Sequence, residues 1–557
     1  MKSYSHASSI RQLCYETIPQ RLFRYALEDP EKVAFVYYDN KIQRTQITRR
    51  ELYEGTEAFA KFLVGKGIKK GDRIALCVSN CVEWMVYDSG IMMAGGCSVR
   101  LWAGQADFLP MLEDCVAIIF DSDPTFHSKL LKVADVFENG NVVSEVFPNL
   151  RLAINVSKTK SSIKGLCYDK LIEKVQNDIS IILPRMEAED ITIISQTSGT
   201  TGKPKRVTHS SFDIINASEV YCKELGLTEN DGFFNERYFG FGGSYPLSFI
   251  ATGLKYVSAD ICSLNAPKDF TKLNEILKNE GCKKIALMPS DLHFCPEKEN
   301  MMDFVMIAGD MTSLDNIKRG LSWSTLIDHF MATAETLIIG HKSFTKDNVD
   351  SYVPGIIGRP FPDMEVKLVD DNNTIVDIGE EGYLCVRAVW CSKVNADGES
   401  ILDKGWFKTT DICKMTENRE IILYGKDVDF ITKSARRVSI RFVEQRMLRY
   451  PDVDDVVVVP VPDEVHGSNI CACLIMKHGT KMHEASMFQF CNENLPQPNN
   501  FDNISSTPDY FLEFDKFPKL GNGKVDRCSM KNLAIDRLIQ KQGLNRPCLK
   551  SQCKIAQ

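Results

Sequence analysis

The pattern of hydrophobic and polar positions in the first 190 residues alternates between two periods. Residues 51–65 place apolar side chains at helical spacing, with Leu52, Phe59 and Phe62 on one side. The apolar run 74–78 follows a Gly71-Asp72 turn and is typical of a buried strand. Helices that alternate with short apolar strands indicate a layered α/β fold, so we predict that class for this region.

The β-branched run 191–194 predicts a further buried strand, and a polar stretch leaves its end. That stretch reads Thr197-Ser198-Gly199-Thr200-Thr201-Gly202-Lys203-Pro204-Lys205. Its two glycines let backbone N–H groups turn toward one point, which hydroxyls and lysines surround, so it suits a polyphosphate. It is not a Walker A loop, because no glycine stands five positions before the Gly202-Lys203 pair. Taken alone, such a stretch is more often an ordinary surface turn.

Later patterns predict a change of architecture near residue 425. A helix is expected at 210–225, strands at 286–289 and 304–308, and a strand- and turn-rich region at 354–425. Beyond it, helices at 441–450 and 484–494 alternate with β-branched strands at 453–461 and 470–476. We therefore predict a large domain of α/β layers plus a β-rich subdomain at 1–424. A small α+β domain at 425–540 and a tail at 541–557 follow it.

Composition narrows the class of protein. The 557 residues are 44% hydrophobic and 25% charged, with a formal net charge of −7, which gives no reason to expect nucleic-acid binding. Nineteen cysteines without metal-ligand spacing are typical of a reduced, intracellular protein. No apolar run reaches the ~20 residues of a transmembrane segment. We expect a cytoplasmic location. Arg11, Arg21 and Arg24 leave a mitochondrial presequence as the alternative.

Several stretches resemble, in the same order, those of the AMP-forming adenylating enzymes. This superfamily includes acyl-CoA synthetases, luciferase and peptide-synthetase adenylation domains, and the resemblance is closest to acyl-CoA synthetases of the medium-chain fatty-acid type. It covers about residues 20–530. Besides the loop at 197–205, the matching strings are Gly358-Arg359-Pro360, Gly405-Trp406-Phe407-Lys408-Thr409-Thr410-Asp411 and the lysine turn Phe517-Pro518-Lys519-Leu520-Gly521-Asn522-Gly523-Lys524 with Val525-Asp526-Arg527.

The resemblance implies an enzyme that joins a carboxylic acid to the AMP part of ATP and then passes the acyl group to coenzyme A. Its cofactors would be ATP, Mg²⁺ and coenzyme A. Lys524, on a mobile small domain, would bridge the carboxylate and the α-phosphate. Glu335 would hold Mg²⁺, as a hard carboxylate oxygen suits, and it is implied as catalytic with Lys524.

The resemblance also implies contacts for each ligand. Tyr238, Phe239 and Phe241 would line the acyl pocket, and the aromatic 238–245 segment favours a medium-chain acyl group. Asp411 would bind both ribose hydroxyls, with Lys426 as a weaker ribose contact. The remaining implied nucleotide and coenzyme A contacts are Thr197, Ser198, Gly199, Thr200, Thr201, Gly202, Lys205, Gly309, Asp310, Met331, Ala332, Thr333, Lys433 and Ala435.

Four positions depart from the family pattern. Arg206 and Ala435 stand at usual glycines, Ala334 replaces a threonine that contacts the α-phosphate, and Lys426 replaces an arginine. Lysine keeps the charge of arginine but loses its planar fork. These departures leave two alternatives open. One is an adenylating enzyme with another acceptor, or a luciferase-like oxygenase, and the other is a nucleotide-binding relative without turnover.

Overall fold

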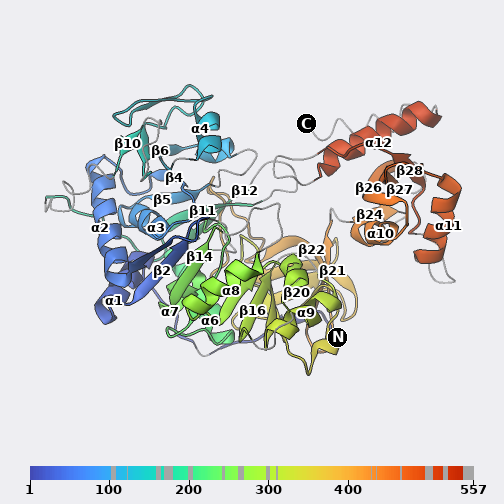
Figure 1. Cartoon of the computed structure of the whole chain (residues 1–557), viewed down its shortest axis with the longest axis horizontal. Coiled ribbons are helices and arrows are strands. Elements are labelled where there is room, and N and C mark those ends of the chain that lie inside the picture. Colours follow the sequence, from blue (N-terminus) through green and yellow to red (C-terminus); the bar gives the residue numbers. More distant parts are fainter. Residues whose placement is uncertain are drawn as a thin grey trace. The chain divides into compact units, whose positions relative to one another are not determined.

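Two parts of the chain fold around separate cores, as the computed structural model shows (Figure 1). One unit comprises Met1–Thr409 and Cys413–Leu423, and the other comprises Thr410–Ile412 and Tyr424–Gln557. The structure describes residues 1–9, 11–101, 108–121, 123–157, 165–168, 180–197, 205–240, 245–260, 269–296, 301–308, 312–427, 430–433, 436–463, 467–495, 506–518 and 525–542.

A seven-stranded sheet forms one layer of the first unit. Its strands are parallel except at one edge, where β12 pairs antiparallel with β11. In spatial order the strands are β10 (Leu166–Cys167), β9 (Leu152–Asn155), β6 (Cys115–Phe120), β4 (Arg73–Cys77), β5 (Cys97–Arg100), β11 (Ile191–Thr197) and β12 (Lys205–Ser210). Beside it lies a small hairpin of β7 (Asp135–Val136) and β8 (Val142–Val143).

A second sheet of fourteen strands continues from a parallel part into a largely antiparallel part. The parallel part, in spatial order, is β17 (Ile327–Met331), β16 (Phe304–Ala308), β15 (Lys284–Leu287), β13 (Gly232–Phe234), β14 (Lys255–Ala259) and β2 (Val33–Tyr38), with antiparallel β3 (Arg44–Thr48) at its edge. The other part is β1 (Tyr4–His6), β20 (Glu365–Val369), β21 (Glu381–Arg387), β22 (Phe407–Met415), β23 (Ile421–Lys426), β19 (Ile356–Pro360) and β18 (Gly340–Phe344).

Helices separate and cover the two sheets (Figure 1). Strand residues alternate between faces, so Phe233 packs in the core shared by both sheets while Phe234 packs in another core. The shared core includes α1 (Ile18–Glu28), α2 (Arg49–Gly65), α3 (Trp84–Met93), α6 (Ser211–Glu224) and α7 (Leu247–Thr252). The outer faces are covered by α4 (Pro124–Leu130) on the seven-stranded sheet and by α8 (Phe270–Asn279) and α9 (Leu314–Trp323) on the fourteen-stranded sheet.

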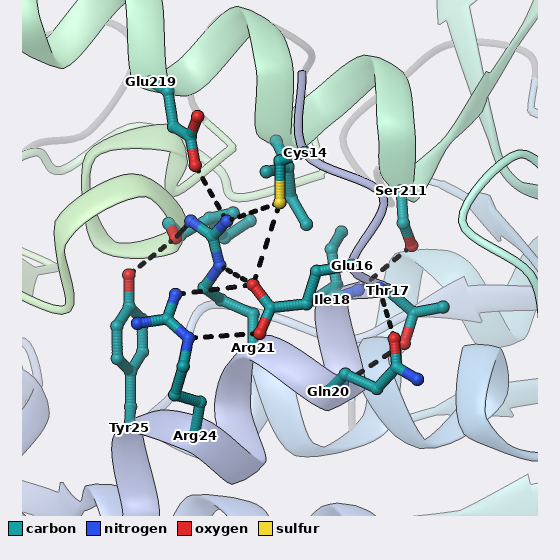
Figure 2. Close-up of polar contacts among 12 residues, drawn as sticks. Cys14, Glu16, Thr17, Ile18, Gln20, Arg21, Arg24, Tyr25, Ser211 and Glu219 are labelled. Carbon is teal, nitrogen blue, oxygen red and sulfur yellow. Dashed lines mark hydrogen bonds and ion pairs between the residues drawn. The ribbon is translucent and has the colours of Figure 1, made fainter. Parts of the chain in front are cut away.

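Polar contacts fix α1 against α6 and α7, as Figure 2 shows. Arg21 donates to Glu219 on α6 at 2.8 Å, to the Ile250 carbonyl on α7 at 3.2 Å and also to Glu16. Because two carboxylates surround this buried guanidinium, its charge is balanced where water is excluded. The N-terminus of α1 is closed by a capping box of Thr17 and Gln20. The N-terminal segment therefore holds α6 in place over the sheet.

The second unit is a small α+β fold. A hairpin of β24 (Phe430–Lys433) and β25 (Arg436–Ser439) precedes a three-stranded sheet, β26 (Val453–Asp463), β27 (Gly467–Met476) and β28 (Tyr510–Glu513). Val456 and Val458 face the core of α10 (Ile440–Met447) and α11 (Glu484–Asn494). Val457 and Val459 face α12 (Arg527–Gln542). The predicted fold class, a large α/β part and a smaller α+β part, is confirmed.

Two further features of the described residues concern disulfides and membrane-spanning helices. Their cysteines form no disulfide, and most are buried. Within the same residues, no helix has both the length and the apolar character needed to cross a membrane.

Candidate active site

The strand before the glycine- and hydroxyl-rich loop ends in a hairpin. β11 and β12 pair in register from Ile193↔His209 to Thr197↔Lys205, so residues 198–204 connect the two strands. The sequence predicted the first strand but not β12, which the loop enters before α6 begins. The predicted contacts Ser198, Gly199, Thr200, Thr201 and Gly202 lie outside the described residues. Lys205 opens β12 and is exposed.

Arg206, which stands at a usual glycine of the family, is tied to acidic side chains. Its guanidinium pairs with Asp397 and lies 3.7 Å from a Glu113 oxygen. The backbone here is also fixed, because the Arg206 carbonyl accepts from Ala396 N–H at 3.0 Å. The positive charge of Arg206 is therefore balanced by carboxylates of the first unit.

The turn that carries Glu335 is held by one hydrogen bond from β12 and by another from the segment after β21. His209 Nε2 donates to the Ala334 carbonyl at 2.7 Å, and Ser392 N–H donates to the Glu335 carbonyl at 2.8 Å. The turn closes on itself through Leu337 N–H, which donates to the Thr333 carbonyl at 3.0 Å. The structure thus brings the predicted metal residue to the strand that leaves the predicted phosphate loop.

His209 acts here as a hydrogen-bond donor through Nε2. Its ring is buried, and burial lowers its pKa, although Asp213 lies 3.9 Å from Nδ1. Burial also raises the pKa of Asp213, whose carboxylate caps α6 by accepting from Ser210 N–H at 2.9 Å. Because a carbonyl can only accept, Nε2 carries the proton.

The Glu335 side chain fits a Mg²⁺ ligand. It is half-buried, and within the described part of the chain no hydrogen bond or ion pair is made by its carboxylate. The same residues hold no cluster of three or more metal-ligating side chains. That is compatible with Mg²⁺, which commonly takes one or two protein carboxylates together with substrate phosphates and water. Met331, Ala332 and Thr333 precede Glu335 at the end of β17 and in the turn.

The two predicted ribose contacts lie on neighbouring strands. Asp411 is buried within β22, and Lys426 is the exposed last residue of β23. β22 and β23 are adjacent in the fourteen-stranded sheet. Their roles at a nucleotide remain predictions.

Lys433, predicted to lie along the coenzyme A path, has a structural contact in the second unit. Its Nζ donates to Asp509 Oδ1 at 2.5 Å, and the other Asp509 oxygen accepts from Ile470 N–H at 2.7 Å. The lysine is buried and joins β24 to the residue before β28. Its contact with coenzyme A remains a prediction.

Hydrogen bonds connect the aromatic segment near residue 238 to residues that follow strands of the seven-stranded sheet. Asn80 accepts from Phe239 N–H at 2.9 Å and donates to the Arg237 carbonyl at 2.9 Å. Tyr238 donates to the Leu101 carbonyl, and Phe239 is buried among core aromatic rings. Neither ring lines the cavity described next, so their contact with an acyl group stays a prediction.

A small cavity lies between α6 and the parallel strands. Its volume is about 20 Å³, and aromatic rings dominate its wall. Asn235 and Ser248 are the polar residues of the lining besides its tyrosines. The aromatic lining residues are Tyr221, Phe233, Tyr245, Tyr256 and Phe330.

Strand ends of the parallel sheet meet near this cavity. Arg237 donates to the Leu287 carbonyl at 3.0 Å and to the Ala308 carbonyl at 3.2 Å, which joins the carboxyl ends of β15 and β16. Ligands of open α/β sheets bind at such ends. The predicted contacts Gly309 and Asp310 follow directly but lie outside the described residues, as do Phe241, Ala435 and Lys524.

Sequence reasoning missed several residues of this region. His209, Tyr221 and Met306 were not singled out, although each touches the Glu335 turn or the cavity. Phe330 was given no role. No local pattern distinguishes these residues from core residues, because their partners lie about 85–125 positions away in the chain.

Comparison with known proteins agrees with this geometry. A family model described as AMP-binding enzyme matches residues 22–393, and one described as AMP-binding enzyme C-terminal domain matches residues 443–524. The medium-chain fatty-acid–CoA ligase of Escherichia coli is 23% identical over 92% of this chain and 89% of its own. A mitochondrial medium-chain acyl-CoA ligase of Bos taurus is 23% identical over 93% and 88%.

A solved structure shares the fold. The Bacillus subtilis O-succinylbenzoate coenzyme A synthetase, in complex with ATP and magnesium ion, superposes with a TM-score of 0.72 at 18% identity. The alignment covers 92% of this chain and 99% of that one. The sequence-based predictions of superfamily, fold class and an enzyme of this class are confirmed. The chain belongs to the AMP-binding enzyme family.

Proposed function

We propose that this protein is an AMP-forming ligase that activates a carboxylic acid of the fatty-acid class with ATP and transfers the acyl group to coenzyme A. Membership of the AMP-binding enzyme family supports the adenylation step. The names of the Escherichia coli and Bos taurus relatives support an apolar acid and coenzyme A as acceptor. The apolar, aromatic cavity supports the same class of acid.

The observation that carries the proposal is the attachment of the Glu335 turn to β12. The hydrogen bond from His209 to the Ala334 carbonyl joins the turn that carries Glu335 to the strand that leaves the loop 198–204. A loop that offers N–H groups and Lys205 would bind the ATP phosphates from one side. Glu335 would hold Mg²⁺, which when bound neutralises charge on the phosphates.

The reaction requires the enzyme to bind two anions, the substrate carboxylate and the α-phosphate of ATP, in contact with each other. A carboxylate is a poor acyl donor because its leaving group is oxide. A carboxylate oxygen attacks the α-phosphorus, the bond to pyrophosphate breaks, and the product is an acyl-adenylate whose leaving group is AMP. We assign Lys524 to bridge the carboxylate and the α-phosphate, because a cation aimed at developing charge is worth on the order of 10²–10³ in rate. Asp411 and Lys426 would orient the ribose.

A thiol would then complete the reaction. The sulfur of coenzyme A attacks the acyl carbon, the bond to AMP breaks, and a thioester forms. We propose that the second unit acts as a mobile lid, residues 425–540, which brings Lys524 to the adenylate and then Lys433 and Ala435 to the thiol path. Relatives usually have glycine at the position of Ala435, so the extra β-carbon would narrow the path by which the coenzyme A thiol reaches the adenylate.

Two assays test the proposal. Carboxylate-dependent ATP–pyrophosphate exchange measures adenylation, and acyl-CoA formation measures transfer. Lys524→Ala should lower exchange by about 10²–10³-fold while ATP still binds. Lys519→Ala, in the same string, is the matched control. Normal exchange by the Lys524 variant would remove this residue from the mechanism. Exchange without thioester would point to another acceptor, and no exchange with any acid would favour a relative without turnover.

A further inference from the structure

The cavity between α6 and the sheet is nearly filled by its own walls. Its free volume is about 20 Å³. A cavity of ~10–15 Å³ is the minimum for one water molecule, so this one has room for little more than a single small group. A pocket for a drug-sized ligand commonly measures ~300 Å³ or more. The size of the cavity, rather than its polarity, is therefore the feature that limits what it can hold.

Two aromatic rings set the depth of the cavity. Tyr221 of α6 and Phe330 of β17 meet edge to face, with ring centroids 5.5 Å apart. The Tyr221 hydroxyl donates to the Met306 sulfur at 3.0 Å, so the ring is fixed at both its edge and its tip. Behind Phe330 lies Phe361, with ring centroids 5.8 Å apart. All four side chains are buried.

The cavity adjoins the proposed reaction site along the chain. Phe330 is the second-to-last residue of β17, the strand that leads into the Glu335 turn, and Leu337 lines the cavity directly after that turn. The 333–337 hydrogen bond closes the turn tightly, so the cavity wall and the Glu335 carboxylate are parts of one short loop. Because Phe330 and Leu337 lie on either side of the turn and both line the cavity, an acyl group on a carboxylate bound beside the turn would extend toward this cavity.

We infer that Tyr221 and Phe330 restrict the enzyme to short-chain aliphatic acids such as acetate and propionate. This inference rests on the proposed function and assigns two specificity-determining residues to it. A longer chain would have to displace two buried rings that pack against Met306 and Phe361, and packed interiors yield little to such pressure. The wild-type enzyme should therefore prefer propionate over octanoate by well over tenfold in kcat/KM, since one methylene in an apolar pocket already changes this ratio by about 10–200-fold.

The test is to remove one ring and measure chain-length preference. In ATP–pyrophosphate exchange, Phe330→Ala should raise the octanoate-to-propionate ratio of kcat/KM by about tenfold or more. Phe330→Leu, which retains more of the core contact, should shift the ratio in the same direction and covers the case in which the alanine variant does not fold. The matched control is Phe344→Ala. Phe344 is equally buried on neighbouring β18 but packs in a different core, against Tyr352.

A binding measurement separates this inference from the proposed function. Calorimetric titration with N-acyl sulfamoyl adenosines, which mimic the acyl-adenylate without reacting, compares propionyl and octanoyl groups without turnover. Tighter binding of the propionyl compound, reversed in the Phe330 variants but not in Phe344→Ala, supports the inference even if no acid gives exchange. Equal or tighter binding of the octanoyl compound by the wild-type protein would overturn it, while exchange activity would stand. A similar shift in the Phe344 variant would also overturn it.

Discussion

The Glu335 turn and the wall of the cavity are neighbours in the chain, but different kinds of interaction fix their structures. The turn depends on directed hydrogen bonds, from His209 to Ala334 and from Ser392 to Glu335. The cavity depends on ring packing between Tyr221, Phe330 and Phe361. Hydrogen bonds fix a polar atom in one geometry, whereas ring packing fixes a volume. The first region is suited to chemistry and the second to choice of substrate.

This difference predicts separable effects of substitution. Changes in the turn should lower the rate with every acid and leave the preference among acids unchanged. Changes in the cavity wall should alter the preference among acids and lower the rate of adenylation less than changes in the turn do.

The largest effect is expected for Glu335→Gln. The amide keeps the shape of the side chain but removes the charge that would hold Mg²⁺, so exchange should fall by about 10²–10³-fold with all acids. The octanoate-to-propionate ratio should stay at the wild-type value. Exchange kinetics over a Mg²⁺ titration measure both quantities. Glu417→Gln, an exposed acid between β22 and β23, is the control. A change in chain-length preference would show that the two regions are not separate.

A smaller effect is expected for His209→Ala. This change removes the donor to the Ala334 carbonyl and lets the turn shift, so activity should fall by about 10–100-fold, as when a group that orients a metal ligand is lost. The loss should appear mainly as a higher Mg²⁺ requirement rather than a lower kcat. His209→Gln, whose amide can donate to the same carbonyl, should recover most of it. A lower kcat with normal Mg²⁺ dependence would contradict a positioning role.

The smallest effect is a difference in pH response between the two regions. Burial lowers the pKa of His209, so its contribution to stability is present above the ordinary value of 6.5 and is lost as pH falls below it. For His341, which stacks on Phe361, burial lowers the pKa, but the hydrogen bond and charge of Asp328, helped by Glu224, outweigh burial and raise it. Its contribution is present below 6.5 and is lost as pH rises through the raised value.

Thermal unfolding between pH 5 and 9 measures this difference. Relative to the wild type, His209→Gln should lose less stability toward acid, and His341→Gln should lose less toward alkali. Parallel curves for both variants would mean that neither histidine contributes to the pH dependence of Tm.

Much of the fold could be predicted from local patterns. Phe304–Ala308 and Glu484–Asn494 have the bounds expected from their periodicity, and the helix after the loop differs from prediction by one residue at each end. β12 was missed because Lys205, Arg206 and His209 give it no continuous apolar run, and pairing with β11 makes it a strand. Propensity is weaker than such tertiary pairing.

The candidate site was only partly predictable for a similar reason. Glu335 could be named because the resemblance to the adenylating enzymes implied it. Side-chain partners such as Asp397 for Arg206 and Asp509 for Lys433 lie far away in sequence, so no local signal reports them. The aromatic 238–245 segment favoured a medium-chain acid, but Tyr238 and Phe239 do not line the cavity, and its volume argues for a shorter one. The proposed selectivity depends on the volume of a cavity whose walls come from distant parts of the chain, so no single stretch of sequence predicts it.

The attachment of Phe330 to the Glu335 turn has a practical consequence for engineering. Phe330 and Glu335 lie in one short peptide segment. A substitution that widens the cavity from β17 can therefore also shift the backbone that positions the Glu335 carboxylate. Tyr221 reaches the same space from α6, a helix that the Arg21 contacts anchor independently. Substitutions intended to broaden the substrate range should therefore start at Tyr221, because side chains can be changed there without altering the segment that carries Glu335.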